Sequence, residues 1–197
     1  MRGEGMAGVD SVALNSAGER NCRRLLAAAR CRFAEDRLAD AITTGIGQIV
    51  LVGTALDTFA AHNPYRRIRV VQLSDAGIAT TATAFDPREP AFVIMLGESG
   101  PRCGEYRWTS LGQAVSRLGG LTAGSQLIAA YPATEADRVA RELRDTSAEV
   151  LEDLDARALA CRYLDLPGVT RHSGEPRVLW ARVRHTAGRP PSSLPAG

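Results

Sequence analysis

The run Gln48-Ile-Val-Leu-Val52, followed directly by Gly53, decides the fold class that this sequence predicts. An uninterrupted apolar run of this kind is typical of a parallel strand that is buried on both of its faces. Comparable strand patterns recur at residues 68–73, 91–96, 126–131 and 177–185. Helical patterns alternate with them at residues 21–44, from 57 onward, at 108–118 and at 134–160. Strands that alternate with helices predict an α/β fold with a doubly wound, mostly parallel sheet.

Length and composition indicate one domain. The chain has 197 residues, of which 45% are hydrophobic, and this is enough apolar material for one ordinary core. Residues 1–18 are rich in glycine and serine and show no period, so we expect a flexible N-terminal arm. Residues 187–197 are rich in proline and serine, which predicts a disordered tail. A single domain is therefore expected over residues 19–186.

Charge and reactive residues exclude several function classes. The net charge is only +2, which gives no strong case for nucleic acid or a membrane surface as the partner. All 24 basic residues are arginine, so neither a Schiff-base lysine nor a P-loop lysine is available. The cysteines and histidines lack the spacing of a zinc site, so no metal is expected. The sequence shows no signal-peptide pattern and no apolar run of about 18 residues, and we expect a cytoplasmic protein.

The carboxyl ends of the predicted strands are where a ligand crevice is expected, because open α/β sheets bind their ligands there. Gly53 lets the backbone approach a ligand closely, and the helix that starts behind it offers free N–H groups. Ala55 stands where a nucleoside site usually has a second glycine. Gln72 stands where a charged acid would hold a ribose. From chemistry alone, the crevice is a weak nucleoside site.

Three stretches carry a resemblance to a known family. The first is Arg30-Cys-Arg-Phe-Ala-Glu-Asp36, which has the form Arg-x-Arg-aromatic-x-x-Asp. The second is the glycine-rich strand and loop Gly45-Ile-Gly-Gln-Ile-Val-Leu-Val-Gly-Thr-Ala-Leu-Asp-Thr58. The third begins at Phe85-Asp-Pro and continues through a strand to Gly97. Together they resemble the class I S-adenosylmethionine-dependent methyltransferases of the leucine carboxyl methyltransferase type, which include O-methyltransferases of polyketide pathways.

The resemblance implies a Rossmann-like methyltransferase fold and a set of cofactor contacts. Arg30 would meet the methionine carboxylate of S-adenosylmethionine. Gly53, Ala55 and Asp57 would line the loop under the cofactor, and Gln72 would face its ribose. Two of these residues have simpler interpretations, since Asp57 is an equally suitable helix N-cap and Arg30 a structurally paired arginine.

The sequence departs from the family in its cofactor region. Ala55 replaces the second glycine, Gln72 replaces the acidic residue, and Ser74 replaces an aspartate that often follows it. Only 17 residues, Ser74 to Pro90, separate the second strand from the next, where the family places a helix, a third strand and an adenine-contacting turn. One crossover alone needs about a dozen residues. We therefore expect a shortened sheet of about five or six strands without the third strand. No cofactor is favoured, and any binding of S-adenosylmethionine should be weak.

The expected function is that of a methyltransferase-like protein that has lost efficient methyl transfer and acts on a small molecule in polyketide-type biosynthesis. As a catalyst it would perform a cyclisation, dehydration or isomerisation, which need positioning and a proton shuttle. The segments that follow the predicted strands at the crevice, residues 53–63, 97–108 and 131–135, supply the candidate catalytic residues His62, Glu98, Tyr106 and Tyr131. Two alternatives stay open, namely an active S-adenosylmethionine-dependent O-methyltransferase and a non-catalytic partner subunit.

Loss of the third strand would also change how the chain associates. The strand at 68–73 would become a sheet edge that is rich in β-branched residues and free of proline. Such an edge is a template for pairing with another strand. We expect a homodimer, or pairing with a partner chain, through this edge. The alternative is that residues 74–90 fold back and cover it.

Overall fold

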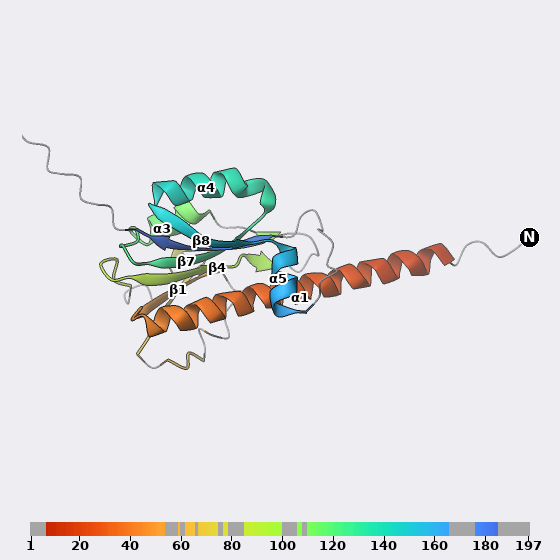
Figure 1. Cartoon of the computed structure of the whole chain (residues 1–197), viewed down its shortest axis with the longest axis horizontal. Coiled ribbons are helices and arrows are strands. Elements are labelled where there is room, and N and C mark those ends of the chain that lie inside the picture. Colours follow the sequence, from red (N-terminus) through yellow and green to blue (C-terminus); the bar gives the residue numbers. More distant parts are fainter. Residues whose placement is uncertain are drawn as a thin grey trace, which may run out of the picture.

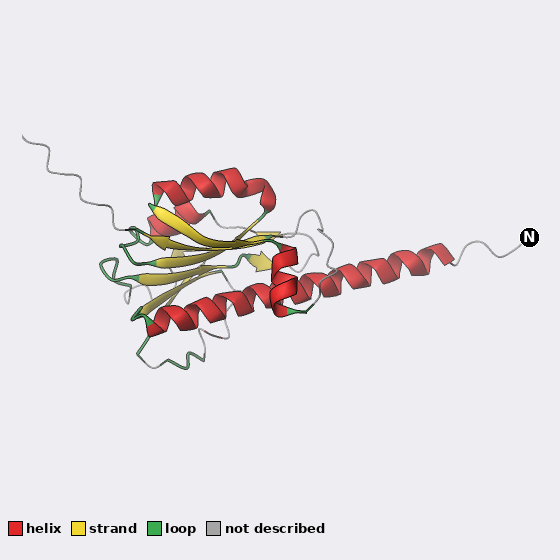
Figure 2. Cartoon of the chain, in the orientation of Figure 1, coloured by secondary structure: helices red, strands yellow, loops and turns green. Residues whose placement is uncertain are grey.

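The computed structural model describes residues 7–53, 59, 62–65, 67–74, 77–78, 85–99, 106–107, 110–165 and 176–184. In this part of the chain, a large β-sheet lies between two layers of helices (Figure 1). The long helix α1 (Ala7–Thr43) and the short helix α5 (Ala156–Tyr163) cover one face of the sheet. Helices α3 (Leu111–Arg117) and α4 (Ala136–Asp145) cover the other face (Figure 2). The predicted α/β class is confirmed.

The large sheet has seven strands in the spatial order β3-β2-β1-β4-β7-β9-β8. They are β1 (Gln48–Val52), β2 (Arg69–Ser74), β3 (Gly77–Ile78), β4 (Ala91–Met95), β7 (Gln126–Tyr131), β8 (Ala148–Leu154) and β9 (Arg177–Val183). The four strands β2, β1, β4 and β7 run parallel, whereas β3 and β9 are antiparallel to their neighbours. A separate hairpin consists of β5 (Glu98–Ser99) and β6 (Tyr106–Arg107).

Strand β1 lies inside the parallel part of the sheet, as the sequence predicts. It pairs with β2 on one side, where Gln48 lies opposite Arg69, and with β4 on the other, where Gln48 lies opposite Ala91. All five residues of β1 and all five of β4 are buried, because helices cover both faces of these strands. The predicted central position of Gln48–Val52 is confirmed.

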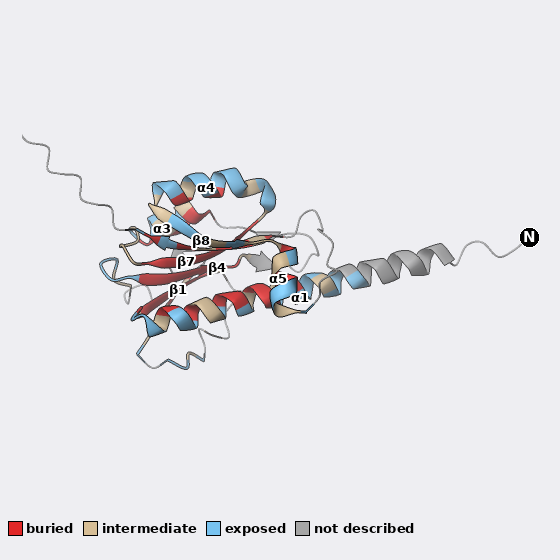
Figure 3. Ribbon diagram, in the orientation of Figure 1, coloured by how far each residue is buried: buried red, intermediate tan, exposed pale blue. Residues whose placement is uncertain are grey.

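Two apolar layers, one on each side of the sheet, hold the helices in place. On one side, Phe33 of α1 is buried together with Ile49 of β1 and Phe92 of β4. On the other side, Val50 and its neighbours contact buried residues of α3 and α4, such as Leu143. Figure 3 shows the buried strands between the helices, and the buried side of α1 against the sheet. In the described part of the chain, no helix is long and apolar enough to cross a membrane.

The single long helix predicted over residues 134–160 is wrong. A short 3-10 turn, η2 (Ala133–Glu135), leads into α4, and β8 then separates α4 from α5. Ser147 ends the helical segment with a left-handed backbone, at φ 55°. The Asp155 side chain accepts a hydrogen bond from the Ala158 N–H at 2.9 Å and so caps α5. With β8 and β3 included, the sheet has seven strands rather than five or six.

The sheet edge at β2 and the N-terminal segment also differ from the expectation. Strand β3 is present, but it has only two residues and pairs with Leu73 and Ser74 at the end of β2. The chain therefore folds back over part of the edge that we expected to be open. Helix α1 begins at Ala7, so residues 7–18 are helical and not an irregular arm. The tail predicted at 187–197 lies outside the described residues.

Candidate functional site

The edge of the sheet between β1 and β4 is the candidate ligand site. The strand order reverses here, because the chain passes from β1 to β2 on one side and from β4 to β7 on the other. Doubly wound sheets bind ligands at such a switch point. Gly53 and Gly97 follow these two strands closely, and both have left-handed backbones, with φ of 82° and 73°. Neither glycine carries a Cβ, so the backbone of both turns permits close approach by a ligand.

Gly53 and Gln72 lie at the same edge. The Gly53 N–H donates a hydrogen bond to the Leu73 carbonyl at 3.0 Å, which ties the turn after β1 to the end of β2. Gln72 lies opposite Leu51 in register and is half-buried on the face of the sheet that α1 covers. The resemblance therefore assigns Gln72 to a position beside the Gly53 turn. The two other predicted loop residues lie outside the described residues: Ala55 and Asp57.

Arg30 lies on α1, and only 6% of its surface is exposed. The Ala41 carbonyl near the end of α1 accepts a hydrogen bond from Ile46, just before β1 begins, so α1 runs antiparallel to β1. From Ala41 back to Arg30 the helix rises about 16 Å, which is about the length of a five-residue strand. Arg30 is therefore level with the carboxyl edge of the sheet, on the same side as Gln72. This placement is compatible with the role that the resemblance implies.

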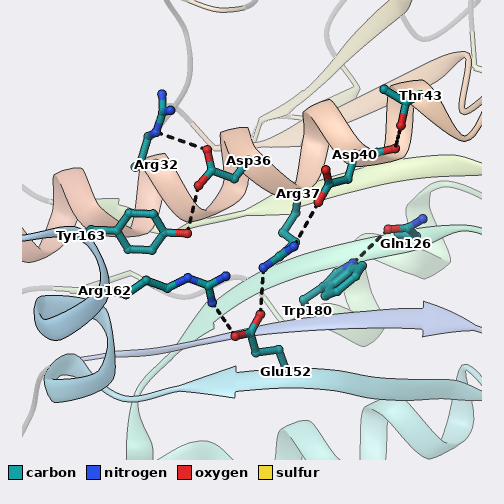
Figure 4. Close-up of polar contacts among 10 residues, drawn as sticks. All are labelled: Arg32, Asp36, Arg37, Asp40, Thr43, Gln126, Glu152, Arg162, Tyr163 and Trp180. Atoms are coloured by element: carbon teal, nitrogen blue, oxygen red, sulfur yellow. Dashed lines mark hydrogen bonds and ion pairs between the residues drawn. The ribbon is translucent and has the colours of Figure 1, made fainter.

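The other residues of the arginine-aromatic-aspartate motif fasten α1 to α5 (Figure 4). Arg32 Nε contacts Asp36 Oδ1 at 3.2 Å, and the Tyr163 hydroxyl of α5 donates to Asp36 Oδ2 at 3.1 Å. Phe33 is fully buried in the core. Three of the four motif residues therefore serve packing and helix docking, and Arg30 is the one that lies at the ligand edge.

A second set of contacts joins α1 to β8, β9 and α5, and we call it the Glu152 clamp. It consists of Glu152, Arg37 and Arg162, in which Glu152 accepts from Arg37 Nη2 at 3.3 Å and from Arg162 Nη1 at 2.5 Å (Figure 4). The Arg37 guanidinium also lies over the rings of Trp180, at 4.8 Å, and Phe33, at 5.5 Å. This geometry is that of a structural ion pair set among aromatic rings.

Three strand ends are joined by polar groups at the carboxyl edge. Tyr131, the last residue of β7, is 3% exposed, and its hydroxyl donates to Asp153 Oδ2 of β8 at 2.8 Å. Arg177, the first residue of β9, donates from Nε to Asp153 Oδ1 at 3.1 Å. Burial and the Asp153 acceptor raise the pKa of Tyr131 to about 12. Tyr131 is therefore a protonated phenol that donates to Asp153, which does not suit the predicted role of proton shuttle at neutral pH.

The hairpin of β5 and β6 follows Gly97 and so begins at the same edge. Glu98 is its first residue, and Tyr106 pairs with Ser99 on the opposite strand. The backbones of these two predicted catalytic residues therefore lie near the end of β4, next to the end of β7. Their side chains lie outside the described residues.

His62 is not part of this group. The amide of the next residue, Asn63, donates to the Ile68 carbonyl at 3.0 Å. Ile68 comes directly before Arg69, which pairs with Gln48 at the amino end of β1. His62 is exposed, and the contact of its neighbour Asn63 places it near the amino edge of the sheet, a strand length of about 16 Å from Gly53. The chain has returned to the start of β2 at this point, so the backbone of His62 lies away from the carboxyl edge where we expected it.

Three residues of the carboxyl edge were not among the predicted site residues: Gly97, Asp153 and Arg177. Gly97 carries the same signal as Gly53, since it ends a buried apolar strand. Asp153 and Arg177 carry no such signal. They meet only because β8 and β9 pair antiparallel, and the sequence pattern indicated a helix where β8 lies.

Comparison with known proteins gives one family and two structures. Residues 8–72 match the leucine carboxyl methyltransferase family. A solved structure of a DUF574 family protein from Streptomyces avermitilis is 15% identical, with a TM-score of 0.45, over 83% of this chain and 82% of that chain. The structure of the 16S rRNA methyltransferase KamB is 13% identical, with a TM-score of 0.36, over 72% of this chain and 90% of that chain. No curated protein matches this chain.

The family match spans most of α1 and runs through β1 into β2. It therefore includes Arg30, Gly53 and Gln72, the described residues to which the resemblance assigns cofactor contacts. The strand order places the same residues at the carboxyl edge of a doubly wound sheet. The predicted resemblance is confirmed over residues 8–72, where this α/β chain is similar to the leucine carboxyl methyltransferase family.

Proposed function

We propose that this protein binds a small organic molecule at the carboxyl edge between β1 and β4 and does not transfer methyl groups efficiently. The observation that carries this proposal is the short connection between β2 and β4. It has 16 residues, 75–90, between the end of β2 at Ser74 and the start of β4 at Ala91. The adenosine half of S-adenosylmethionine needs structure that this connection is too short to supply.

The length of the connection can be accounted for piece by piece. Strand β3 runs antiparallel to β2 and uses residues 77–78. Residues 85–90 form a turn before β4, which the buried Gln48 side chain fastens through the Asp86 and Glu89 carbonyls at 2.7 and 2.8 Å. Six residues, 79–84, remain between these pieces. A crossover with its helix needs about a dozen residues, so a helix and a further parallel strand do not fit.

The residues at the edge fit one end of S-adenosylmethionine and not the other. Arg30 and the Gly53 turn suit a carboxylate and a close backbone approach, which are the needs of the methionine end. At the ribose position, Gln72 is a neutral partner, and a hydrogen bond to a charged group is worth about 1.5–3 kcal/mol where a neutral one is worth about 0.5–1.5 kcal/mol. At the adenine end, the short connection leaves too few residues for the helix and strand that would surround the ring.

The substrate class that we propose is a polyketide-type small molecule, and the reaction class is a cyclisation, dehydration or isomerisation. The family resemblance supports the substrate class. The hairpin supports the reaction class, because the backbones of Glu98 and Tyr106 lie near the ligand edge. Tyr131, which is protonated, and His62, which is distant, are less suited to a proton shuttle. Glu98 and Tyr106 are the candidates for the proton shuttle.

The test is an incubation with methyl-labelled S-adenosylmethionine and a panel of hydroxylated aromatic ketones and acids. We expect no label in any acceptor, while at least one acceptor raises the melting temperature of the protein by mass action. Transfer of label would establish the active O-methyltransferase instead. Failure of every acceptor to raise the melting temperature would favour the non-catalytic partner subunit.

A further inference from the structure

Arg177 lies at the rim of the proposed ligand site. It is the first residue of β9, and its partner in register is Tyr131 at the carboxyl end of β7. β7 is in turn the neighbour of β4, which leads to Gly97. Two strand spacings, or about 10 Å, separate Arg177 from the end of β4. A small organic molecule at the switch point can span this distance.

Most N–H donors of Arg177 have no acceptor within the part of the chain that the structure describes. A guanidinium has five N–H donors. Asp153 accepts from Nε, and the Tyr131 hydroxyl is the other polar group beside it. At least three donors therefore have no partner among the described residues. The side chain is 32% exposed, so solvent and a ligand can reach it.

Asp153 and Tyr131 hold this guanidinium in place. Both oxygens of Asp153 are engaged, one by Arg177 and the other by the buried Tyr131. The contact with Asp153 also raises the pKa of Arg177 above its ordinary value, so the guanidinium keeps its charge at every physiological pH. A planar, fixed guanidinium binds carboxylates and phosphates through two parallel hydrogen bonds.

We infer that Arg177, oriented by Asp153 and Tyr131, binds an oxyanion of the ligand, so that the ligand is a small organic acid or a phosphorylated small molecule. The inference rests on the proposed function, because it assigns a substrate class to the same site. It adds a binding residue from β9, the last strand in the described part of the chain, far from the segment that matches the family. Asp153 and Tyr131 act through Arg177 as positioning residues.

The test uses three matched aromatic probes, namely salicylate, methyl salicylate and phenyl phosphate. Nitrogen-edited NMR spectra of the arginine Nε–H groups follow each titration. We expect salicylate or phenyl phosphate to shift the Arg177 signal and to bind about tenfold or more tightly than methyl salicylate, since a charged pair of hydrogen bonds is lost in the ester. The tighter of the two anions identifies the oxyanion as a carboxylate or a phosphate.

Variants separate Arg177 from general charge effects. Arg177→Gln should remove the preference for the anion, and Arg177→Lys, which keeps the charge but not the planar fork, should weaken it. The control is Arg184→Gln, since Arg184 also pairs through Nε with a carboxylate, Glu149, but follows β9 at the amino edge of the sheet. It should keep the full preference.

Two results would overturn the inference. One is equal binding of salicylate and methyl salicylate by the natural protein, and the other is an unchanged preference in folded Arg177→Gln or Arg177→Lys. Either result leaves the proposed function intact, because the methyl-transfer assay does not involve Arg177. The proposed function fails separately, when label from S-adenosylmethionine appears in an acceptor.

Discussion

At the scale of single residues, the site depends on backbone shape as much as on side chains. Gly53 and Gly97 end neighbouring parallel strands, and both lie in the left-handed region that side chains with a Cβ disfavour. The same edge holds the buried Arg30 and the Tyr131–Asp153 hydrogen bond. A ligand here would meet open backbone in the middle and fixed polar groups on either side.

Replacing Gly53 by alanine should destabilise the protein by about 1–2 kcal/mol, because a Cβ is strained at φ 82°. The matched control is Gly47→Ala on the other side of β1. A Cβ at Gly47 meets nothing within 4 Å, and its φ is not left-handed. The control should change the stability by less than about 0.5 kcal/mol. Urea unfolding measures both, and equal stabilities of the two variants would contradict the account of the Gly53 turn.

The stability of the protein should fall between pH 10 and pH 12 through Tyr131. Its pKa is raised from 10.0 to about 12 in the folded protein. Over this interval the unfolded chain releases the phenolic proton while the folded protein retains it, so unfolding becomes easier as pH rises. The loss from this residue is roughly 2–3 kcal/mol across the interval. Tyr131→Phe should remove it, and urea unfolding at several alkaline pH values would show an unchanged slope if Tyr131 is not responsible.

At the scale of elements, the docking of α1 decides where Arg30 lies. The Arg32–Asp36–Tyr163 contacts and the Glu152 clamp hold α1 against α5 and against the last strands of the sheet. The motif that resembles a cofactor signature is therefore mostly a helix-docking motif in this structure. Together with the buried apolar face of α1, these contacts keep Arg30 level with the carboxyl edge.

Glu152→Gln should destabilise the protein by about 1–3 kcal/mol. Glu152 is 26% exposed and Arg37 16% exposed, so loss of the carboxylate leaves a largely desolvated guanidinium whose remaining ion pair in the described part of the chain is the one with Asp40 at 3.0 Å. Arg37 Nε already has no hydrogen-bond partner among the described residues. The control is Glu149→Gln, in an exposed pair with Arg184, which should cost less than about 1 kcal/mol. Thermal unfolding compares them, and equal losses would show that the clamp contributes no more than a surface ion pair.

The elements that could be predicted from the sequence are those whose burial is uniform. Gln48–Val52 and Gln126–Tyr131 are continuous apolar strands, and their predicted bounds agree with the structure. Strand β8 was missed because it is an edge strand, with Val150 46% and Leu151 38% exposed, and its sequence lacks an apolar run. The cap residue Asp155 was the available signal that a new helix begins there.

At the scale of the whole molecule, the two edges of the sheet differ. Strand β3 pairs with the last two residues of β2, and the rest of that edge is not paired with β3. The opposite edge, β8, carries Glu149, Glu152 and Asp153, and such charges discourage pairing with a second copy. The sequence predicted that β2 would be an edge strand. It could not predict that part of the 75–90 connection pairs with β2, because β3 has only two residues and no strand pattern of its own.

Association through the β2 edge remains a prediction, with a two-fold dimer as the simplest form. Light scattering at tens of micromolar protein should give the dimer mass. Leu151→Lys, on the exposed part of β8, should leave that mass unchanged. A monomer mass for the natural protein would contradict the prediction, and a dimer that is lost in Leu151→Lys would move the interface to β8.

The central claim is that a methyltransferase-like fold has kept its ligand edge and lost its hold on adenosine. Two losses of about 1.5 kcal/mol or more, at the ribose and at the adenine, weaken binding by at least about a hundredfold. Gln72→Glu restores only the ribose partner and should tighten binding by about tenfold, so this variant should still bind weakly.

The most direct measurement is a calorimetric titration of the natural protein with S-adenosylmethionine. The account predicts no complex in the low-micromolar range, because Gln72 is neutral and the connection between β2 and β4 is too short for the missing helix and strand. A saturable complex with a low-micromolar dissociation constant would contradict it and would favour the active O-methyltransferase.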